Sequence, residues 1–287
     1  MRCFCCQSNK LILKLIDQKK YHECYKCGFM FTFSEAYTHA NSSVLNHYQN
    51  YDPHEQVATS KQSFFRWTLD YLSSEIKTNQ RSILDVGCGY GYFLELASRN
   101  NWNTYGVEIL DSAVEVARKK LGQENIFHGS LRNAHYPDEY FDAITLWDVL
   151  VMVDSPVEEL RECYRILKPG GKLGIRVRNV DFQKVIYRIY FPLNKVVSAL
   201  KIKKPYVFHP HNFSKKSLDL ILRREGFDNI EIINSPLTKG DPYGHSQFRG
   251  FASIIKYATD FSTKILSNLS RGRLIIGPSL LAWAEKV

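Results

Sequence analysis

A glycine-rich turn between a strand and a helix places the strongest constraint on the fold of this chain. The strand-like segment 83–86, which is apolar except for Asp85, is followed by Gly87, Gly89 and Gly91, and a helical pattern starts at Tyr92. Glycines at alternate positions allow a ligand to approach the backbone without interference from Cβ atoms. We therefore predict a ligand-binding turn at the carboxyl end of a buried strand.

Strands and helices continue to alternate after this turn. The expected helices cover 92–100, 112–121 and 157–167, and the expected strands cover 104–108, 126–128 and 172–177. Such alternation is typical of an α/β protein with a parallel, doubly wound sheet that carries helices on both faces.

An acidic residue on the next strand narrows the choice of ligand. Glu108 lies 21 residues after Gly87, where a carboxylate can accept hydrogen bonds from both ribose hydroxyls of an adenosine. A dinucleotide-binding fingerprint would place its third glycine at position 92, which is Tyr92 here. The pattern therefore favours an adenosyl ligand over a nicotinamide dinucleotide.

These segments resemble the first two motifs of the class I S-adenosylmethionine-dependent methyltransferases. Segments 137–142, 143–150 and 165–171 resemble later motifs of the same family, in the family's order. The resemblance covers about residues 81–235. It implies a Rossmann-like, doubly wound, seven-stranded sheet with an antiparallel last strand, in which 229–234 pairs with 279–285.

The resemblance also implies which residues contact S-adenosylmethionine. The implied contacts are Asp85, Gly87, Cys88, Gly89, Gly91, Glu108, Ile109, Ser130, Leu131, Trp147 and Asp148. Asp85 is available to the ammonium group, and Glu108 to the ribose. Ile109, Ser130 and Leu131 are expected near the adenine. Trp147 and Asp148 are expected on the methionine side.

One position departs from the family pattern. Similar sequences carry Glu-His after Trp-Asp-Val-Leu, whereas this chain has Val151 and Met152. Methyl transfer can proceed through alignment of the nucleophile with the methyl group, so activity is still expected. The candidate bases are His209, His211 and Asp148. Each histidine could equally be a structural residue, and Asp148 could instead orient the cofactor.

Two Cys-x-x-Cys pairs near the N-terminus predict a metal site with the ligand spacing of a zinc ribbon. The predicted zinc ligands are Cys3, Cys6, Cys24 and Cys27. Segments 11–16 and 21–25 are expected to form two short strands, and Cys5 and His22 are substitute ligands. A closed four-thiolate site is structural because it leaves no position for water. The alternative is a set of reduced or redox-active thiols.

Basic residues outnumber acidic residues by 38 to 29, and the excess is concentrated in one stretch. Eight Lys or Arg residues and no acidic residue lie between Phe182 and Leu218. This stretch favours anionic partners, which include phosphate-bearing molecules, nucleic acid and a membrane surface. The alternative is a basic face that contacts only solvent.

The expected domains follow from these motifs. We expect a zinc ribbon at 1–37, a helical linker or lid at 38–80 and a methyltransferase domain at 81–287, with cap insertions at about 181–213 and 238–277. Apolar residues at helical spacing in the second insertion either pack against the core or lie on a membrane surface.

A cytoplasmic location is expected because the N-terminus lacks the apolar region of a secretory signal. The longest apolar run, 274–284, is too short to span a membrane and contains Pro278. No transmembrane helix is therefore expected.

Three functions remain open. The preferred function is methyl transfer to a small-molecule acceptor, such as a sugar, a glycan-lipid or another anionic biosynthetic intermediate, because the basic cap favours anionic acceptors. The ribbon and the C-terminal pattern also resemble those of natural-product and polysaccharide methyltransferases. An RNA methyltransferase is the first alternative, although the Asn-Pro-Pro-Tyr type of motif is replaced by 146–149. The second alternative is a protein that binds S-adenosylmethionine without catalysis.

Overall fold

Seven strands form the central sheet of the protein, in the order β10-β11-β8-β7-β4-β5-β6. The strands are β4 (Arg81–Val86), β5 (Trp102–Glu108), β6 (Ile126–His128), β7 (Phe141–Trp147), β8 (Leu167–Arg178), β10 (Phe227–Asn234) and β11 (Ser279–Lys286). The structure, a computed structural model, describes residues 1–32, 54–78, 80–193, 208–236 and 275–287. Strand β11 is antiparallel to both of its neighbours, which confirms the predicted antiparallel last strand.

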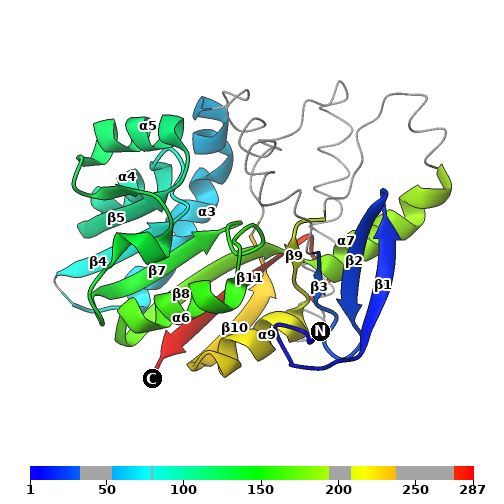
Figure 1. The fold of residues 1–287 in the computed structure, drawn as a ribbon. Helices are drawn as coiled ribbons and strands as arrows, with labels where there is room; N and C mark the ends of the chain where they lie inside the picture. Colours follow the sequence, from blue (N-terminus) through cyan, green and yellow to red (C-terminus); the bar gives the residue numbers. More distant parts are fainter. Residues whose placement is uncertain (33–53, 79, 194–207, 237–274) are drawn as a thin grey trace.

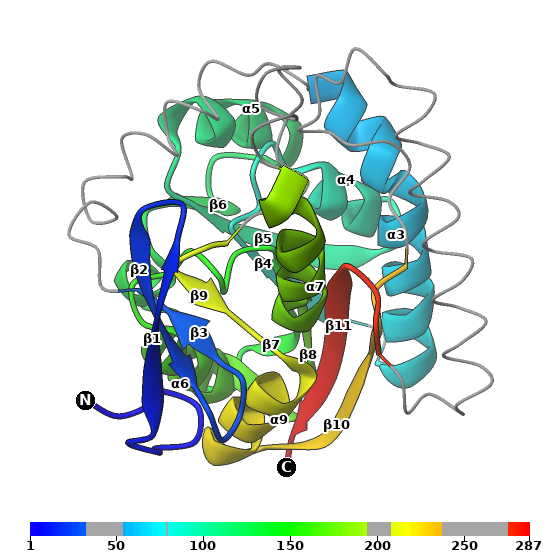
Figure 2. The same cartoon turned by 90° about the vertical axis from the view of Figure 1, so that its right-hand side faces the viewer.

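Helices cover both faces of this sheet (Figure 1). They are α3 (His54–Glu75), α4 (Tyr92–Ser98), α5 (Asp111–Leu121), α6 (Pro156–Ile166), α7 (Val180–Tyr190) and α9 (Lys215–Arg224), with the 3-10 turns η1 (Leu131–Ala134) and η2 (Phe191–Leu193). Helices α3, α4 and α5 lie on one face, and α6 and α9 lie on the other (Figures 1 and 2). The doubly wound arrangement is therefore confirmed.

The direction of each strand residue follows from the alternation of side chains along a strand. On β4, Leu84 and Val86 belong to the apolar cluster on the α6 and α9 side. Ile83 belongs to the cluster on the α3 and α4 side. By the same alternation, Asp85 lies on the α3 and α4 side, at the carboxyl end of the strand.

The N-terminal ribbon forms a second sheet, in the order β1-β2-β3-β9. Its strands are β1 (Leu11–Ile16), β2 (Lys19–Cys24), β3 (Met30–Phe31) and β9 (His211–Asn212). Strand β2 begins earlier than expected because Asp17 and Gln18 alone make the turn, both with positive φ, as a two-residue hairpin requires. The fourth strand comes from a distant part of the chain, between α7 and α9 (Figure 2).

Three side-chain hydrogen bonds add to the β3–β9 backbone pairing that attaches the ribbon to this distant segment. The Ser214 hydroxyl donates to the Cys27 carbonyl at 2.7 Å, and the Asn212 amide donates to the Met30 carbonyl at 3.1 Å. The Tyr21 hydroxyl donates to the Phe208 carbonyl at 3.2 Å. Phe29 and Phe31 of the ribbon belong to the same apolar cluster as the α6 side of the sheet, whereas Tyr21 belongs to a separate cluster with Phe208. The ribbon therefore shares a core with the larger sheet.

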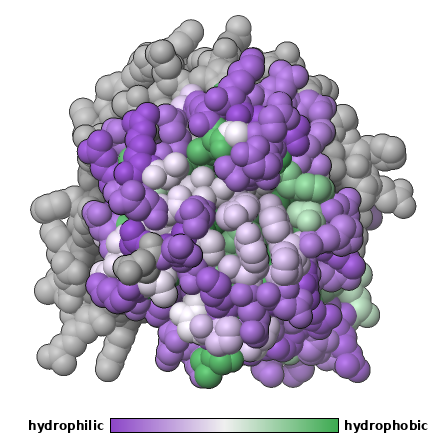
Figure 3. Space-filling model, turned by 90° about the vertical axis from the view of Figure 1, so that its left-hand side faces the viewer, coloured by the Kyte–Doolittle hydropathy of each residue, from purple (hydrophilic) through white to green (hydrophobic). Residues whose placement is uncertain are grey.

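The expected linker and caps are only partly described. Helix α3 lies within the expected linker 38–80, and α7 starts the expected insertion 181–213. Residues 33–53 and 194–207, and nearly all of the insertion 238–277, lie outside the described residues. Among the described helices, none has the length and apolar character needed to cross a bilayer. The face shown in Figure 3 is mostly hydrophilic, with small apolar areas.

Replacing Ser214 tests the attachment of the ribbon. Ser214 and Ser155 both cap helices through their side chains, but Ser214 also bonds to the ribbon. A lost cap costs about 1 kcal/mol, and a lost buried hydrogen bond adds about 1 kcal/mol. We expect Ser214→Ala to lower the free energy of unfolding by about 2 kcal/mol, roughly twice the effect of Ser155→Ala. Equal losses in chemical denaturation would show that the ribbon bond contributes nothing.

Candidate functional site

The glycine turn lies at the carboxyl end of β4 and has the backbone conformation that its composition predicts. Gly87, Gly89 and Gly91 have φ values of 71°, 53° and 74°, in the left-handed region that disfavours side chains. A Cβ atom at Gly87 would lie 2.3 Å from Val149 Cγ2, whereas one at Gly89 would meet no atom within 4 Å. Val149 therefore packs closely against the turn at Gly87, whereas the space at Gly89 is open.

The Glu108 carboxylate joins this turn to the end of β5. One of its oxygens accepts the backbone N–H of Gly89 at 2.8 Å. The other accepts the N–H groups of Ile109 and Leu110 at 2.8 and 2.9 Å. The Glu108 residue is buried, but Ile109 beside it is 52% exposed. A buried acid and an exposed apolar side chain therefore adjoin the open space at Gly89.

The neighbouring segment after β6 is held beside Glu108. The N–H of Gly129 donates to the Glu108 carbonyl at 2.9 Å. Ser130 is exposed, and Leu131 is buried in the core at the start of η1. Cys88 is largely buried beneath the turn, where its sulfur would lie 2.7 Å from a Cβ atom at Gly106. Of these side chains, Ser130 alone is exposed.

Asp85 is a buried acid directly below the glycine turn. Thr145 Oγ1 donates to its carboxylate at 2.7 Å. Burial raises the pKa of Asp85 to about 7, although the Thr145 hydroxyl and the Lys61 ammonium act in the opposite direction. The carboxyl group is therefore close to half-ionised at neutral pH, and an added positive charge would ionise it.

Asp148 lies between two cations at the end of β7. Its carboxylate accepts from Arg176 Nη1 at 2.6 Å and lies 3.6 Å from Lys61 Nζ. Burial alone would raise the pKa of Asp148, but Arg176 and Lys61 outweigh burial and lower it. The preceding Trp147 ring packs edge-on against Phe64, with 5.0 Å between the ring centroids. Helix α3 thus supplies both a cation and an aromatic ring to this part of the site.

The two candidate histidines occupy different environments. His211 lies in β9, where its Nε2 is 3.0 Å from the Val153 carbonyl and its ring stacks on Phe29. His209 is half-buried, and Arg178 and Asp148 both influence its charge. Burial lowers the pKa of each histidine to about 4, so both are neutral at pH 7. The structure brings His209 toward Asp148, whereas the His211 ring lies against the ribbon.

The four predicted zinc ligands come together at the base of the ribbon. The Sγ atoms of Cys3, Cys6, Cys24 and Cys27 all lie within 4.8 Å of one another. The Cys3–Cys27 and Cys6–Cys24 sulfur pairs are each 3.5 Å apart. A tetrahedral zinc site with 2.3 Å bonds needs sulfurs about 3.8 Å apart. These four thiols could therefore hold zinc.

The two substitute ligands are not members of this group. His22 stacks on Phe31, with 5.6 Å between the ring centroids, and Cys5 is a buried neighbour of the group.

Three polar residues near the site were not predicted from the sequence: Lys61, Thr145 and Arg176. Arg176 lies between the apolar residues Ile175 and Val177 of β8, and a cation at this place in a strand was an indication available from the sequence. Lys61 gave none, because one lysine in a polar helix does not reveal which face packs on the sheet.

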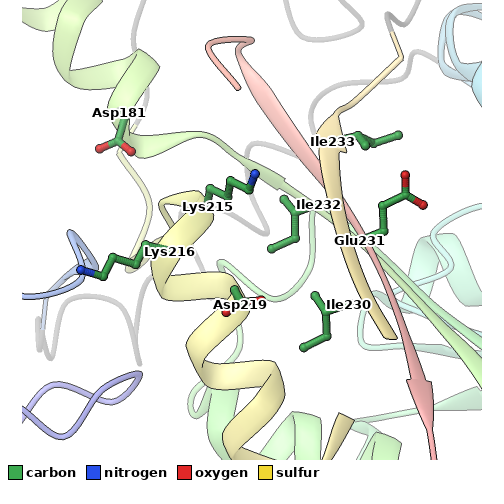
Figure 4. A pocket seen from close by; sticks show the side chains of 8 residues that line it. All are labelled: Asp181, Lys215, Lys216, Asp219, Ile230, Glu231, Ile232 and Ile233. Carbon is green, nitrogen blue, oxygen red and sulfur yellow. The ribbon is translucent and has the colours of Figure 1, made fainter. Parts of the chain in front are cut away.

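An open hollow of about 680 Å³ lies elsewhere, between α9 and β10. Figure 4 shows Ile230 and Ile232 pointing toward α9, with Lys215 and Asp219 on the helix opposite. Its lining includes no residue of the glycine turn. We therefore do not assign the chemistry to this hollow.

Comparison with known proteins identifies the family. Residues 42–232 match the family model described as a methyltransferase domain. The chain belongs to this methyltransferase family. The fold and the methyltransferase family predicted from the motifs are thereby confirmed.

The curated relatives of this methyltransferase include two enzymes of ubiquinone biosynthesis. The ubiquinone biosynthesis O-methyltransferase of Coxiella burnetii is 28% identical over 131 residues, which cover 42% of this chain and 53% of the relative. That of Xanthomonas oryzae pv. oryzae is 33% identical over 117 residues, which cover 39% and 48%. The chain thus spans about half the length of these relatives.

Solved structures show the same fold. A Thermotoga maritima methyltransferase, described as a possible histamine N-methyltransferase, has a TM-score of 0.51 at 20% identity and covers 87% of this chain and 99% of its own. The plantazolicin methyltransferase BpumL has a TM-score of 0.51 at 20% identity, with 84% and 90% covered. At this identity the likeness concerns the fold alone.

Metal analysis tests the cysteine group. We expect about one zinc per chain in the purified methyltransferase, and loss of that zinc with lower thermal stability in Cys24→Ser. Cys163→Ser, which changes a buried thiol outside the group, should retain the zinc. A folded wild-type protein without metal would rule out the zinc site.

The pH dependence of stability tests the environment of Asp85. A carboxyl group whose folded-state pKa is about 7 binds its proton more tightly in the folded than in the unfolded chain, so stability falls as pH rises from about 4 to 7. We expect Asp85→Asn to gain stability relative to wild type across this range and to level off above pH 7. Asp70→Asn, which removes an exposed carboxylate on α3, is the control. A gain that does not change with pH would contradict the assignment.

Proposed function

We propose that this methyltransferase transfers the methyl group of S-adenosylmethionine to a small-molecule acceptor bound at the carboxyl ends of β7 and β8. The observation that carries the proposal is the open space at Gly89 between the acidic residues Asp85 and Glu108. When bound, the cofactor supplies an electrophilic methyl group on a sulfonium. All other roles in the reaction belong to residues of this chain.

The cofactor contacts are assigned from the site. Glu108 would accept the ribose hydroxyls while it keeps its bonds to the turn. The exposed Ile109 and Ser130 would flank the adenine, and the cofactor ammonium would ionise Asp85. Trp147 and Asp148 would border the methionine side, because they lie at the carboxyl end of β7, which is next to β4.

His209 is the candidate proton acceptor on the acceptor side. It is neutral at pH 7 because burial lowers its pKa to about 4, so its ring has a free acceptor capacity in one tautomer. Asp148 is ionised but already accepts from Arg176, which suits it to a positioning role. His211 is assigned a structural role between Val153 and the ribbon aromatics.

The proposed acceptor is an anionic biosynthetic intermediate, which includes phosphate-bearing sugars and glycan-lipids. Two observations support an anionic class: the formal net charge of +9 and the acid-free basic stretch between Phe182 and Leu218. The names of the curated relatives support a small-molecule acceptor, and an oxygen nucleophile. The four cysteines would hold a structural zinc, and the enzyme would act in the cytoplasm.

Methyl transfer from labelled cofactor tests the proposal. The purified enzyme is incubated with methyl-labelled S-adenosylmethionine and separate small-molecule, lipid and RNA fractions of a cell extract that lacks this enzyme. We expect label in the small-molecule or lipid fraction, and at least about tenfold less with Glu108→Ala, which loses a charge-assisted contact to the ribose. Label in RNA alone would contradict the proposal, as would cofactor binding without any labelled product.

A further inference from the structure

Two arginines occupy the same side of β8 at its carboxyl end. Ile175 and Val177 are buried in the cluster on the α6 side, so Arg176 and Arg178 lie on the opposite side, toward α3. The Arg176 guanidinium lies 5.4 Å from the centre of the Phe64 ring of α3, which confirms this direction. Arg178 lies closer than Arg176 to the carboxyl end of β8, and it is half-buried.

The charges at this edge do not balance. Lys61, Arg176 and Arg178 supply three cations, Asp148 pairs with the first two, and the buried Asp85 also acts on Lys61. Arg176 also donates to Ser235 Oγ at 3.0 Å. The Arg178 side chain forms no hydrogen bond or ion pair with another described residue, although its charge acts on Asp148 and His209. One half-buried guanidinium is therefore left without a counter-ion in the described part of the chain.

From this geometry we infer that Arg178, supported by Lys61 and Arg176, binds a carboxylate or phosphate group of the methyl acceptor. This inference rests on the proposed function and gives the acceptor a specific contact. A guanidinium can donate two parallel hydrogen bonds to either anion. Asp148 keeps Lys61 and Arg176 in place, and Arg178 supplies the uncompensated charge. The anion would then lie beside His209, and the bound acceptor would lie next to Trp147 and the methionine side of the cofactor.

Small anions test the inference without knowledge of the acceptor. The full chain is saturated with S-adenosylhomocysteine and titrated, at constant ionic strength, with inorganic phosphate and separately with acetate. We expect at least one of these anions to bind. The substitution Arg178→Gln should weaken anion binding by about tenfold, which is the effect of losing hydrogen bonds to a charged group. Asp148→Asn, which removes the carboxylate that pairs with Lys61 and Arg176, should tighten anion binding. Preference for phosphate or for acetate identifies the anion.

Controls separate this inference from the proposed function. Arg188→Gln removes the same charge from an exposed position on α7 and should leave anion binding unchanged. Affinity for S-adenosylhomocysteine should stay within about twofold in Arg178→Gln and Arg188→Gln, which also shows that the variants are folded. The inference is overturned if neither anion binds to a protein that binds S-adenosylhomocysteine, or if Arg188→Gln weakens binding as much as Arg178→Gln. Failure to bind S-adenosylhomocysteine would instead contradict the proposed function.

Discussion

The carboxylate of Glu108 is the interaction on which the candidate site depends. It accepts one N–H from the glycine turn after β4 and two from the backbone that follows β5. Bonds between a carboxylate and backbone N–H groups are stronger than bonds between neutral groups, and they fix the ends of two adjacent parallel strands. Gly89 then faces open space, and Asp85 lies below the same turn. One acidic side chain thus organises the position and the charge of the proposed cofactor site.

The ribbon contributes to the site because it fixes the segment of chain that leads from His209 into β9. Strand β9 is the edge of the ribbon sheet, and it begins two residues after His209. The His209 backbone donates to the side chain of Asn212, which in turn donates to Met30 in the ribbon. Ordering of the ribbon by metal would therefore also fix the segment that places His209 near Asp148. This connection gives a physical reason for the presence of a four-cysteine ribbon on a methyltransferase domain.

Local patterns predicted much of the fold. The glycine turn, the alternation of strands and helices and the cysteine spacing all act over short stretches of sequence, and their predictions agree with the structure. Strand β8 begins at Leu167, earlier than the expected residue 172, because Pro169 and the following glycines are accommodated within the strand. Local pattern gave no indication that His211 would pair with the ribbon, since that contact joins residues about 180 positions apart. Lys61 could not be placed in the site for the same reason.

Calorimetric titration of the purified wild-type protein tests the central claim most directly, because it asks which nucleotide the turn and Glu108 accept. S-adenosylhomocysteine and NADH are titrated separately under identical conditions. The account predicts saturable binding of about one S-adenosylhomocysteine per chain, as expected of a single Rossmann-like site, and no saturable binding of NADH. Binding of NADH in preference to S-adenosylhomocysteine, or of neither ligand, would contradict it.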